Sequence, residues 1–345
     1  MKKNLFLAVV TAVLLASCSS NEAIDETTLT SSNAVGFGTF IGRNTKAAST
    51  DIANVKVSGF YVTAFSTGAT SWTTPSVAPD FMYNQKVEWN TDKWEYTPVK
   101  YWPGVISGST YGKVTFFGWN DVAGTVASAS SYAGIPTLGF TCAQLAVNQK
   151  DLVADMLTDK TLSDGAVKFE FDHILSRIGF AAKLADQYSG AEVKVTSIKV
   201  YYAEDKVKSE GTYTFNTDNT AGSIWSFTPS AFMAEDTPDE MVAVGGVTLP
   251  NDATHDAIGL NASSNHLMLI PQSVVAGDVY IDMEYTVTTG SQTVTYKITK
   301  DLPAITWAPG KHYTYTFTLT LNPVEFDTDI SVNDWTSDSS TGINL

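Results

Sequence analysis

The chain has few cysteines, and their positions exclude an internal disulfide bond as a source of stability. Its 345 residues include two cysteines, Cys18 and Cys142, and Cys18 lies in an N-terminal leader. Only one cysteine then remains in the body of the chain, so no intramolecular disulfide can form. We therefore expect a hydrophobic core to stabilise the protein, and 43% hydrophobic content over this length suffices for one or two domains.

Basic residues are also scarce. Lys and Arg together number 21 against 36 Asp and Glu, and only Arg43 and Arg177 are arginines. Loss of Lys2 and Lys3 with a leader leaves 19 basic residues against the same 36 acidic ones, a formal charge near −17. Such a surface repels nucleic acids and anionic lipid headgroups, so we expect neither as a partner.

The histidines and the lone Cys142 give no sign of a catalytic or metal site. No histidine pair has zinc spacing. His173 lies in the strand-like stretch FDHILSRIGF, where a packed structural role is the simplest interpretation, and Cys142 has no basic neighbour to activate it. We predict no cofactor, no metal and no catalytic residue. The four histidines are His173, His255, His266 and His312.

Two acidic pairs are interpreted as solvated strand edges. They are Asp151 with Asp155, and Asp327 with Asp329. The stretch DTDISVND, which contains the second pair, lacks the glycine and the terminal glutamate of an EF-hand loop. The glycine-rich GFGTFIG follows no strand and opens no helix, so it is not a dinucleotide fingerprint.

The N-terminus has the anatomy of an export signal. MKKNLFLAVVTAVLLASCSS carries two lysines, an apolar run too short for a comfortable membrane span, and small residues around Cys18. Leu15 to Cys18 resembles a bacterial lipobox, which implies a signal peptide over residues 1–17 and lipidation of Cys18. No later segment approaches transmembrane length, so we expect membrane attachment through the lipid alone.

Beyond a Ser/Thr-rich linker, β-type periodicity dominates. VKVSGFYVTAF (Val55 to Phe65) and KVTFFGWN (Lys113 to Asn120) are predicted strands, and KVEWNTDKWEY is a predicted hairpin. The best helical pattern is AQLAVNQKDLVADML, Ala143 to Leu157. Two groups of strands predict two antiparallel β-sandwiches, residues 44–186 and 187–345, with the boundary near Ala185 to Gly190.

The motifs taken together resemble the fimbrillin family of the Bacteroides group, the FimA- and Mfa-like pilin precursors. The resemblance covers nearly the whole chain. It rests on the lipobox, the strand AVGFGTF and three motifs: Tyr-Trp-Pro-Gly at Tyr101 to Gly104, FDHILSR at Phe171 to Arg177, and Trp-x-Pro-Gly-Lys-x-Tyr at Trp307 to Tyr313. It implies an all-β protein of two tandem transthyretin-like sandwich domains.

The resemblance also implies a maturation route. In the family an outer-membrane lipoprotein precursor, with palmitate as a lipid, is cut by an arginine-specific protease and becomes part of an extracellular fimbrium used in cell adhesion. In this sequence the cut falls between Arg43 and Asn44, with Lys46 as the other basic residue in reach. Arg177, by contrast, is expected in a core strand that a protease cannot reach. Residues 18–43 are then the lost propeptide, and its strand, Ala34 to Ile41, leaves a groove. The residues of that displaced strand are Val35, Phe37, Thr39 and Ile41.

A strand from a neighbouring subunit would fill the groove by β-augmentation, and it should alternate apolar and polar residues. Sequence alone leaves open which C-terminal stretch is the donor strand. The expected partners are other pilin subunits, the maturation protease, and a host or bacterial surface ligand. The candidate donor residues are Ile330, Val332, Ile343 and Leu345, with Val324 and Phe326 just before them.

Three alternatives stay open at this point. If every C-terminal strand stays within its own domain, the chain fits a tip or accessory fimbrial subunit. A monomeric lipoprotein that binds glycans or host ligands through an aromatic patch is the second. A glycan-active enzyme, which needs two facing carboxylates, is the third. Core packing or cross-strand pairing in hairpins is the favoured interpretation of most of these aromatic residues. The residues considered for the aromatic patch are Trp72, Trp89, Trp94 and Trp102.

Overall fold

The computed structural model describes most of the chain between residues 33 and 335. The described ranges are 33–41, 52–73, 79–120, 126–127, 134–215, 225–235, 238–242, 245–261, 266–320 and 326–335. Within them β-strands predominate, which confirms the all-β prediction, and helical residues are confined to one short α-helix and two 3-10 turns. These are α1 (Ile52–Ser58), η1 (Ala146–Asn148) and η2 (Leu162–Asp164).

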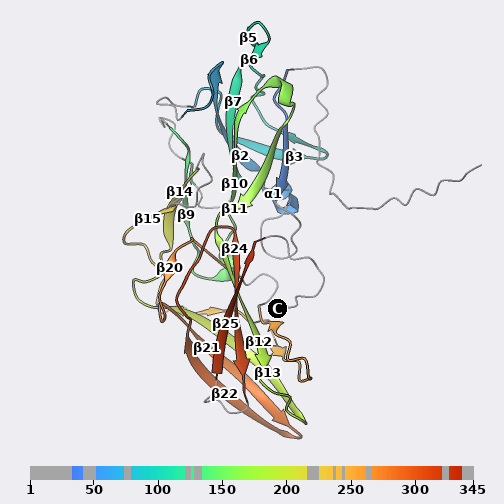
Figure 1. The fold of residues 1–345 in the computed structure, drawn as a ribbon, viewed down its shortest axis with the longest axis vertical. Helices are drawn as coiled ribbons and strands as arrows, with labels where there is room; N and C mark the ends of the chain where they lie inside the picture. The colour runs from blue at the N-terminus through green and yellow to red at the C-terminus, as the bar shows by residue number, and fades with distance from the viewer. Residues whose placement is uncertain are drawn as a thin grey trace, which may run out of the picture.

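The upper part of the elongated molecule in Figure 1 is built on a seven-stranded sheet. Its first strand, β1, pairs in parallel with β11, and the other neighbours for which a register is defined are antiparallel. In order across the sheet the strands are β1 (Phe37–Ile41), β11 (Val167–His173), β10 (Val153–Lys160), β7 (Lys113–Asn120), β2 (Phe60–Gly68), β3 (Met82–Asn90) and β4 (Lys93–Glu95).

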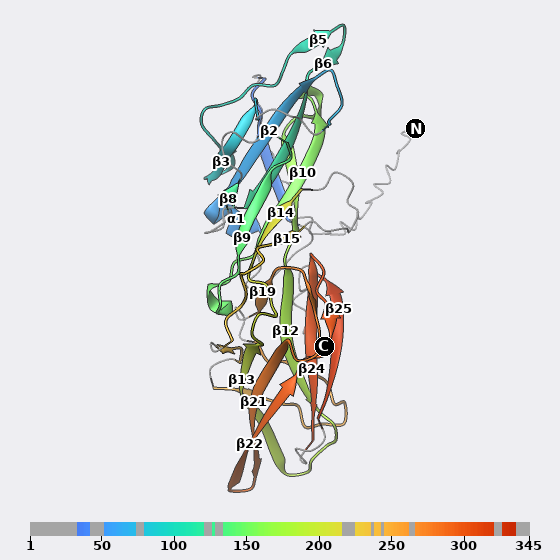
Figure 2. The same ribbon diagram turned by 90° about the vertical axis from the view of Figure 1, so that its left-hand side faces the viewer.

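The lower part holds two five-stranded sheets (Figure 2). The first contains β18 (Ile258–Gly259), β12 (Ser176–Leu184), β24 (Lys311–Leu319) and β25 (Phe326–Asp334), with β19 (Leu267–Leu269) also on β12. The second contains β16 (Asp239–Glu240), β13 (Ala191–Tyr202), β21 (Val279–Thr289) and β22 (Gln292–Asp301), with β17 (Val247–Thr248) also on β13.

Smaller sheets complete the fold. One four-stranded sheet has the order β15 (Trp225–Phe227), β14 (Glu210–Thr214), β9 (Thr137–Thr141) and β8 (Val126–Ala127). The two-stranded sheets are β20 (Ser273–Val274) with β23 (Ile305–Thr306), and β5 (Val105–Ser107) with β6 (Thr110–Tyr111).

The seven-stranded sheet is covered on both faces, and β7 shows why. Phe116 belongs to an apolar cluster on one face, together with β1 and α1 residues, whereas Phe117 belongs to the larger cluster on the other face. There Phe117 packs edge-on against Phe215, with ring centroids 5.2 Å apart. A strand buried on both faces reads as a continuous apolar run, as KVTFFGWN does.

The chain passes from the upper to the lower sheets between β11 and β12. Only Ile174 and Leu175 separate these strands, and β12 pairs with β24 from Arg177 to Leu184. The change of sheet therefore precedes the expected boundary at Ala185 to Gly190, and β14, which follows that boundary, returns to pair with β9. The division into sandwich domains 44–186 and 187–345 stays a prediction.

Two local predictions are wrong and one is confirmed. Val55 to Ser58 is helical and forms the end of α1, so the predicted strand begins only at Phe60. The helical pattern Ala143 to Leu157 forms η1 and then β10. The predicted hairpin KVEWNTDKWEY is present, with Trp89 opposite Trp94 across β3 and β4.

Candidate assembly site

Strand β1 lies at the edge of the upper sheet and is held by β11. The two strands run in parallel, with Phe37 opposite Val167 and Ile41 opposite Phe171. The Val167 amide donates a hydrogen bond of 2.8 Å to the carbonyl of Gly36 just ahead of the strand. Removing β1 would make β11 an edge strand with unpaired backbone groups.

The residues that precede β1 form backbone hydrogen bonds with a second segment, Lys100 to Trp102, which makes the other wall of the groove. The Val35 amide donates to the Lys100 carbonyl at 2.9 Å, and the Trp102 amide donates to the Asn33 carbonyl at 2.7 Å. The Tyr96 hydroxyl donates to the Val35 carbonyl at 2.8 Å. Burial raises the pKa of Tyr96 to about 12, so this phenol stays a neutral donor at physiological pH.

Phe37 fills the centre of the groove between these walls. Its side chain is fully buried. Burying a phenylalanine ring stabilises a fold by roughly 1.5–3 kcal/mol relative to exposure. Without β1, an apolar hollow lined by aromatic rings would face water. The rings around Phe37 are those of Tyr96 at 5.2 Å, Phe60 at 5.9 Å, and Phe116 and Phe169 at 6.2 Å each, measured between centroids.

The other predicted residues of the displaced strand follow the same face. Val35 is 2% exposed and Thr39 is 7% exposed. The Thr39 hydroxyl has no hydrogen-bond partner among the described residues. Ile41 ends β1, and its side chain lies outside the description. The period-two alternation expected for this strand therefore places Val35, Phe37 and Thr39 together in the groove.

The predicted processing and lipidation residues lie outside the described residues. This holds for Cys18, Arg43, Asn44 and Lys46. Arg177 is 1% exposed in β12 and lies 3.2 Å from the His266 ring, Nη2 to Nδ1. The prediction that Arg177 belongs to a core strand is confirmed, and a protease has no access to it in the folded chain.

Two of the predicted donor residues lie on β25, the last described strand. β25 pairs with β24 along its whole length, with Ile330 opposite Tyr315 and Val332 opposite Tyr313. Ile330 packs partly against the main core, whereas Val332 is 49% exposed. β25 is thus an edge strand (Figure 2), and Ile330 is the apolar side chain among its described ones that packs against the core. Ile343 and Leu345 lie outside the described residues.

Trp335, directly after β25, is anchored at the junction of the upper and lower sheets. Its ring stacks on His173, whose Nδ1 lies 2.7 Å from Oδ2 of the buried Asp151. The Trp335 amide donates a hydrogen bond to the Gly310 carbonyl at 2.7 Å. Gly310 has φ +66°, and a Cβ there would lie 3.1 Å from the His173 carbonyl, so this turn favours glycine. Sequence analysis did not single out Trp335, whose anchoring residues are distant in the chain.

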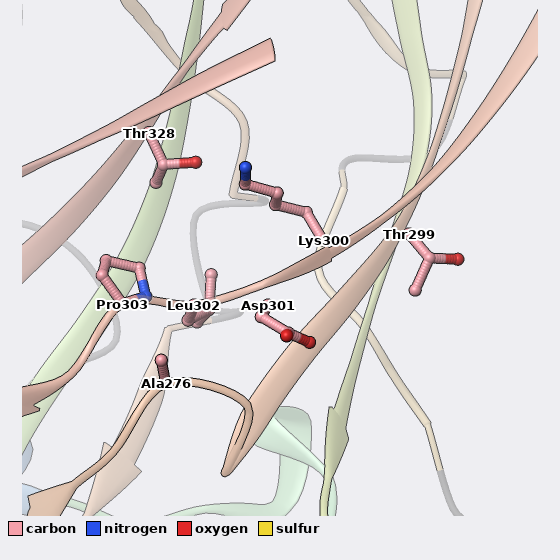
Figure 3. Close-up of a pocket in the computed structure, with 7 residues that line it drawn as sticks. All are labelled: Ala276, Thr299, Lys300, Asp301, Leu302, Pro303 and Thr328. Carbon is pink, nitrogen blue, oxygen red and sulfur yellow. The ribbon is translucent and has the colours of Figure 1, made fainter. Parts of the chain in front are cut away.

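A hollow of about 450 Å³ lies beside β25 (Figure 3). Lys300 reaches from the end of β22 toward Thr328 on β25. Its mixed, open lining offers no set of convergent polar groups such as small-molecule sites have. The residues around it are Ala276, Thr299, Lys300, Asp301, Leu302, Pro303 and Thr328.

The four tryptophans proposed for a glycan patch do not form one. Trp94 and Trp102 are buried, at 3% and 4% exposure. Trp72 packs against the cluster on the opposite face of the sheet. Trp89 is partly buried, meets Trp94 edge-on at 5.2 Å, and has Lys56 Nζ 3.8 Å from its ring centroid. The alternative of an exposed patch formed by these residues is wrong, and core packing, the favoured interpretation, is confirmed.

The polar residues considered for chemistry have structural partners. Burial raises the pKa of the Cys142 thiol to about 12, so it stays protonated, as expected of a buried free thiol. Asp155 is partly buried and accepts hydrogen bonds from the amides of Met156 and Glu170. Asp151 is 4% exposed and lies beside His173, so the interpretation of this pair as a solvated strand edge is wrong. Among the described residues no group of three or more His, Cys, Asp and Glu is placed to hold a metal ion.

None of the described helices is long and apolar enough to span a membrane.

Comparison with known proteins places these features in a family. A model of the family described as fimbrillin-like matches residues 45–335. The fimbrium subunit Fim1C of Phocaeicola vulgatus is 26% identical over 392 aligned positions that cover 100% of both chains. A solved fimbrial protein from Bacteroides vulgatus has the same fold, with TM-score 0.69 and 22% identity over 88% of this chain and 99% of its own. The chain belongs to the fimbrillin-like family.

Proposed function

We propose that the protein is a structural subunit of a cell-surface fimbrium that polymerises by strand exchange after cleavage at Arg43. The observation that carries this proposal is the plug formed by residues 33–41. It fills an aromatic groove between β11 and Lys100 to Trp102, and its last strand residue, Ile41, lies two positions before Arg43. A cut there would separate the plug from the rest of the chain.

The leader sequence supports the first steps of this route. The lipobox ending at Cys18 would give an outer-membrane lipoprotein precursor, and cleavage after Arg43 would release the body of the chain from its lipid. The mature subunit begins at Asn44 and belongs to an extracellular fimbrium. We assign it no catalytic role.

The energetics favour exchange over an empty groove. Loss of the plug exposes the rings of Phe60, Phe116 and Phe169 and the free edge of β11. A strand from another copy covers both and restores the backbone hydrogen bonds. Because the groove is empty only after the cut, the intact plug prevents premature polymerisation.

Replacing the cleavage residues tests the proposal. The variants are Arg43→Ala, Lys46→Ala and the double substitution, each exposed to an arginine-specific protease and examined by mass spectrometry and electron microscopy. We expect Lys46→Ala to form filaments and the double variant to stay monomeric with residues 33–41 attached. Normal filaments from the uncut double variant would overturn the proposal.

A tip or accessory subunit is the second candidate, and the anchoring of β25 favours it. β25 pairs with β24 over nine residue pairs, and Trp335 holds its end at His173. A subunit that keeps its last strand can accept a neighbour's strand but cannot donate its own. The mature chain would then stop growth at one end and could not exchange strands with copies of itself. Strand-exchanged oligomers of the isolated chain, dimers included, would exclude this candidate.

A further inference from the structure

Two distant segments of the chain carry the same alternating residues. Val35, Phe37, Thr39 and Ile41 follow the pattern V-x-F-x-T-x-I, and so does the stretch from Val324 to Ile330. The second set is Val324, Phe326, Thr328 and Ile330. The pattern occurs at these two places only in the 345-residue sequence.

In the first segment the pattern is the face that fills the groove. Val35, Phe37 and Thr39 are all buried there, and Phe37 lies among four aromatic rings. Residues two apart in a strand point to the same face, so a strand with the same four residues presents the same surface. Identical side chains are the closest match that a groove shaped for this set can receive.

The second segment belongs largely to β25, an edge strand whose described side chains are exposed or only partly buried. β25 pairs only with β24 among the described strands, and Asp329, Ser331 and Val332 on it are exposed. Thr328 and Ile330 are only partly buried. None of the described β25 side chains is fully buried, whereas Val35 and Phe37 are buried in the groove. The described part of β25 therefore has less burial to lose on leaving than a strand seated in the groove has.

We infer that β25 of a neighbouring subunit occupies the place of β1, in parallel with β11, and that Phe326 enters the Phe37 position. This inference rests on the proposed strand exchange and adds its donor, direction and register. The direction follows because β1 runs parallel to β11, and the same residues in the same order fit only in the same direction. Val324, Thr328 and Ile330 take the positions of Val35, Thr39 and Ile41.

The residues between the matched positions differ between the two segments, and this difference places a condition on the exchanged state. Gly36 and Gly38, both buried, are replaced by Glu325 and Asp327, so this face has to be open to water in the exchanged state. Asp327 then comes opposite Lys168, the partner of Gly38 on β11. An ion pair there would contribute modestly and would weaken with salt.

The C-terminal residues Ile343 and Leu345 match the groove less well than the segment from Val324 to Ile330 does. They supply two apolar residues at period two, and Thr341 and Ser339 precede them in the alternation. No alignment of that stretch places a phenylalanine at the Phe37 position, which is the most enclosed part of the groove.

Disulfide trapping measures the register directly. Phe40 lies opposite Glu170, so the inference brings Asp329 of one copy opposite Glu170 of the next. Neighbouring strands lie about 4.8 Å apart, within disulfide reach, whereas a slip of two residues moves the Cα atoms to about 8 Å. A chain with Glu170→Cys is mixed with a second chain carrying Asp329→Cys, Asp327→Cys or Ser331→Cys, cut at Arg43, and oxidised.

We expect a reducible dimer with Asp329→Cys only. Filaments whose dimers form instead with Asp327→Cys or Ser331→Cys, or with none of the three, would overturn the register and leave strand exchange standing. Chains that are cut after Arg43 and form no oligomers would overturn strand exchange itself, and the register with it. The native Cys142 is buried and does not compete.

A matched pair of alanine variants gives a second readout. Phe326→Ala removes the ring predicted to enter the groove, whereas Val332→Ala changes a residue that falls beyond it. We expect Phe326→Ala to reduce oligomer yield about a hundredfold and Val332→Ala to leave it unchanged. Equal yields from both variants, with filaments present, would contradict the assignment of Phe326 to the Phe37 position.

Discussion

The ring of Trp335 lies flat on the ring of His173, with centroids 4.1 Å apart and planes within 5° of parallel. The contact joins the last described residue of the chain to the end of β11. β11 therefore has two roles: it pairs with β1 along its edge, and its last residue, His173, anchors Trp335 at the end of β25. A strand that leaves for a neighbour must therefore break this contact or extend from it.

Trp335→Ala should increase local unfolding of β25 while the rest of the sheet stays folded. The variant loses the burial of the indole ring and the stacking, and a stacked aromatic pair contributes about 1 kcal/mol beyond its burial. We expect hydrogen exchange of the β25 amides to accelerate by at least about tenfold. Trp335→Phe, which keeps a flat ring, is the matched control and should restore most of the protection. Unchanged exchange in Trp335→Ala would show that β24 alone holds the strand.

Phe37→Ala should destabilise the uncut precursor by about 3–5 kcal/mol, because it leaves a cavity among four aromatic rings. Denaturant unfolding of the precursor measures the loss. Thr39→Val is the control on the same face. It removes a buried hydroxyl without a described partner, so we expect a change below about 1 kcal/mol. A Phe37→Ala precursor as stable as the wild type would mean that the plug contributes little.

Asp155 should make the precursor more stable in mild acid. Burial raises the pKa of this carboxyl to about 6, above its unfolded value near 3.9. Between these two values the folded state binds more protons than the unfolded state, so the contribution of Asp155 to the free energy of unfolding rises as pH falls from about 6 toward 4. Comparing the pH dependence of the melting temperature of wild type and Asp155→Asn isolates it. A wild-type profile identical to that of the variant would contradict this assignment.

Much of the fold could be predicted from the sequence, because strand periodicity is a local property of the chain that the folded strands keep. The apolar run Lys113 to Asn120 forms β7, and Arg177 lies in a core strand as expected. Local pattern failed where distant side chains decide the backbone. The Asn120 side chain donates a hydrogen bond to the Asp151 carbonyl and accepts one from the Val153 amide. Strand β10 begins at Val153, inside the segment whose periodicity predicted a helix.

The assembly site was only partly predictable. The alternation of Val35, Phe37 and Thr39 is local and identifies a strand, whereas its parallel pairing with β11 joins segments some 130 positions apart and has no local signal. The exposed-patch alternative for the tryptophans stayed open for a related reason. Alternation shows that Trp94 faces one side of a strand but not whether another layer covers that side.

Intact mass and N-terminal sequencing of subunits taken from isolated filaments test the central claim most directly. The account predicts chains that begin at Asn44, free of lipid, with residues 33–41 absent from the filament. Filament subunits that still carry residues 33–41 in covalent connection with the rest of the chain would contradict it, because their grooves would already be full.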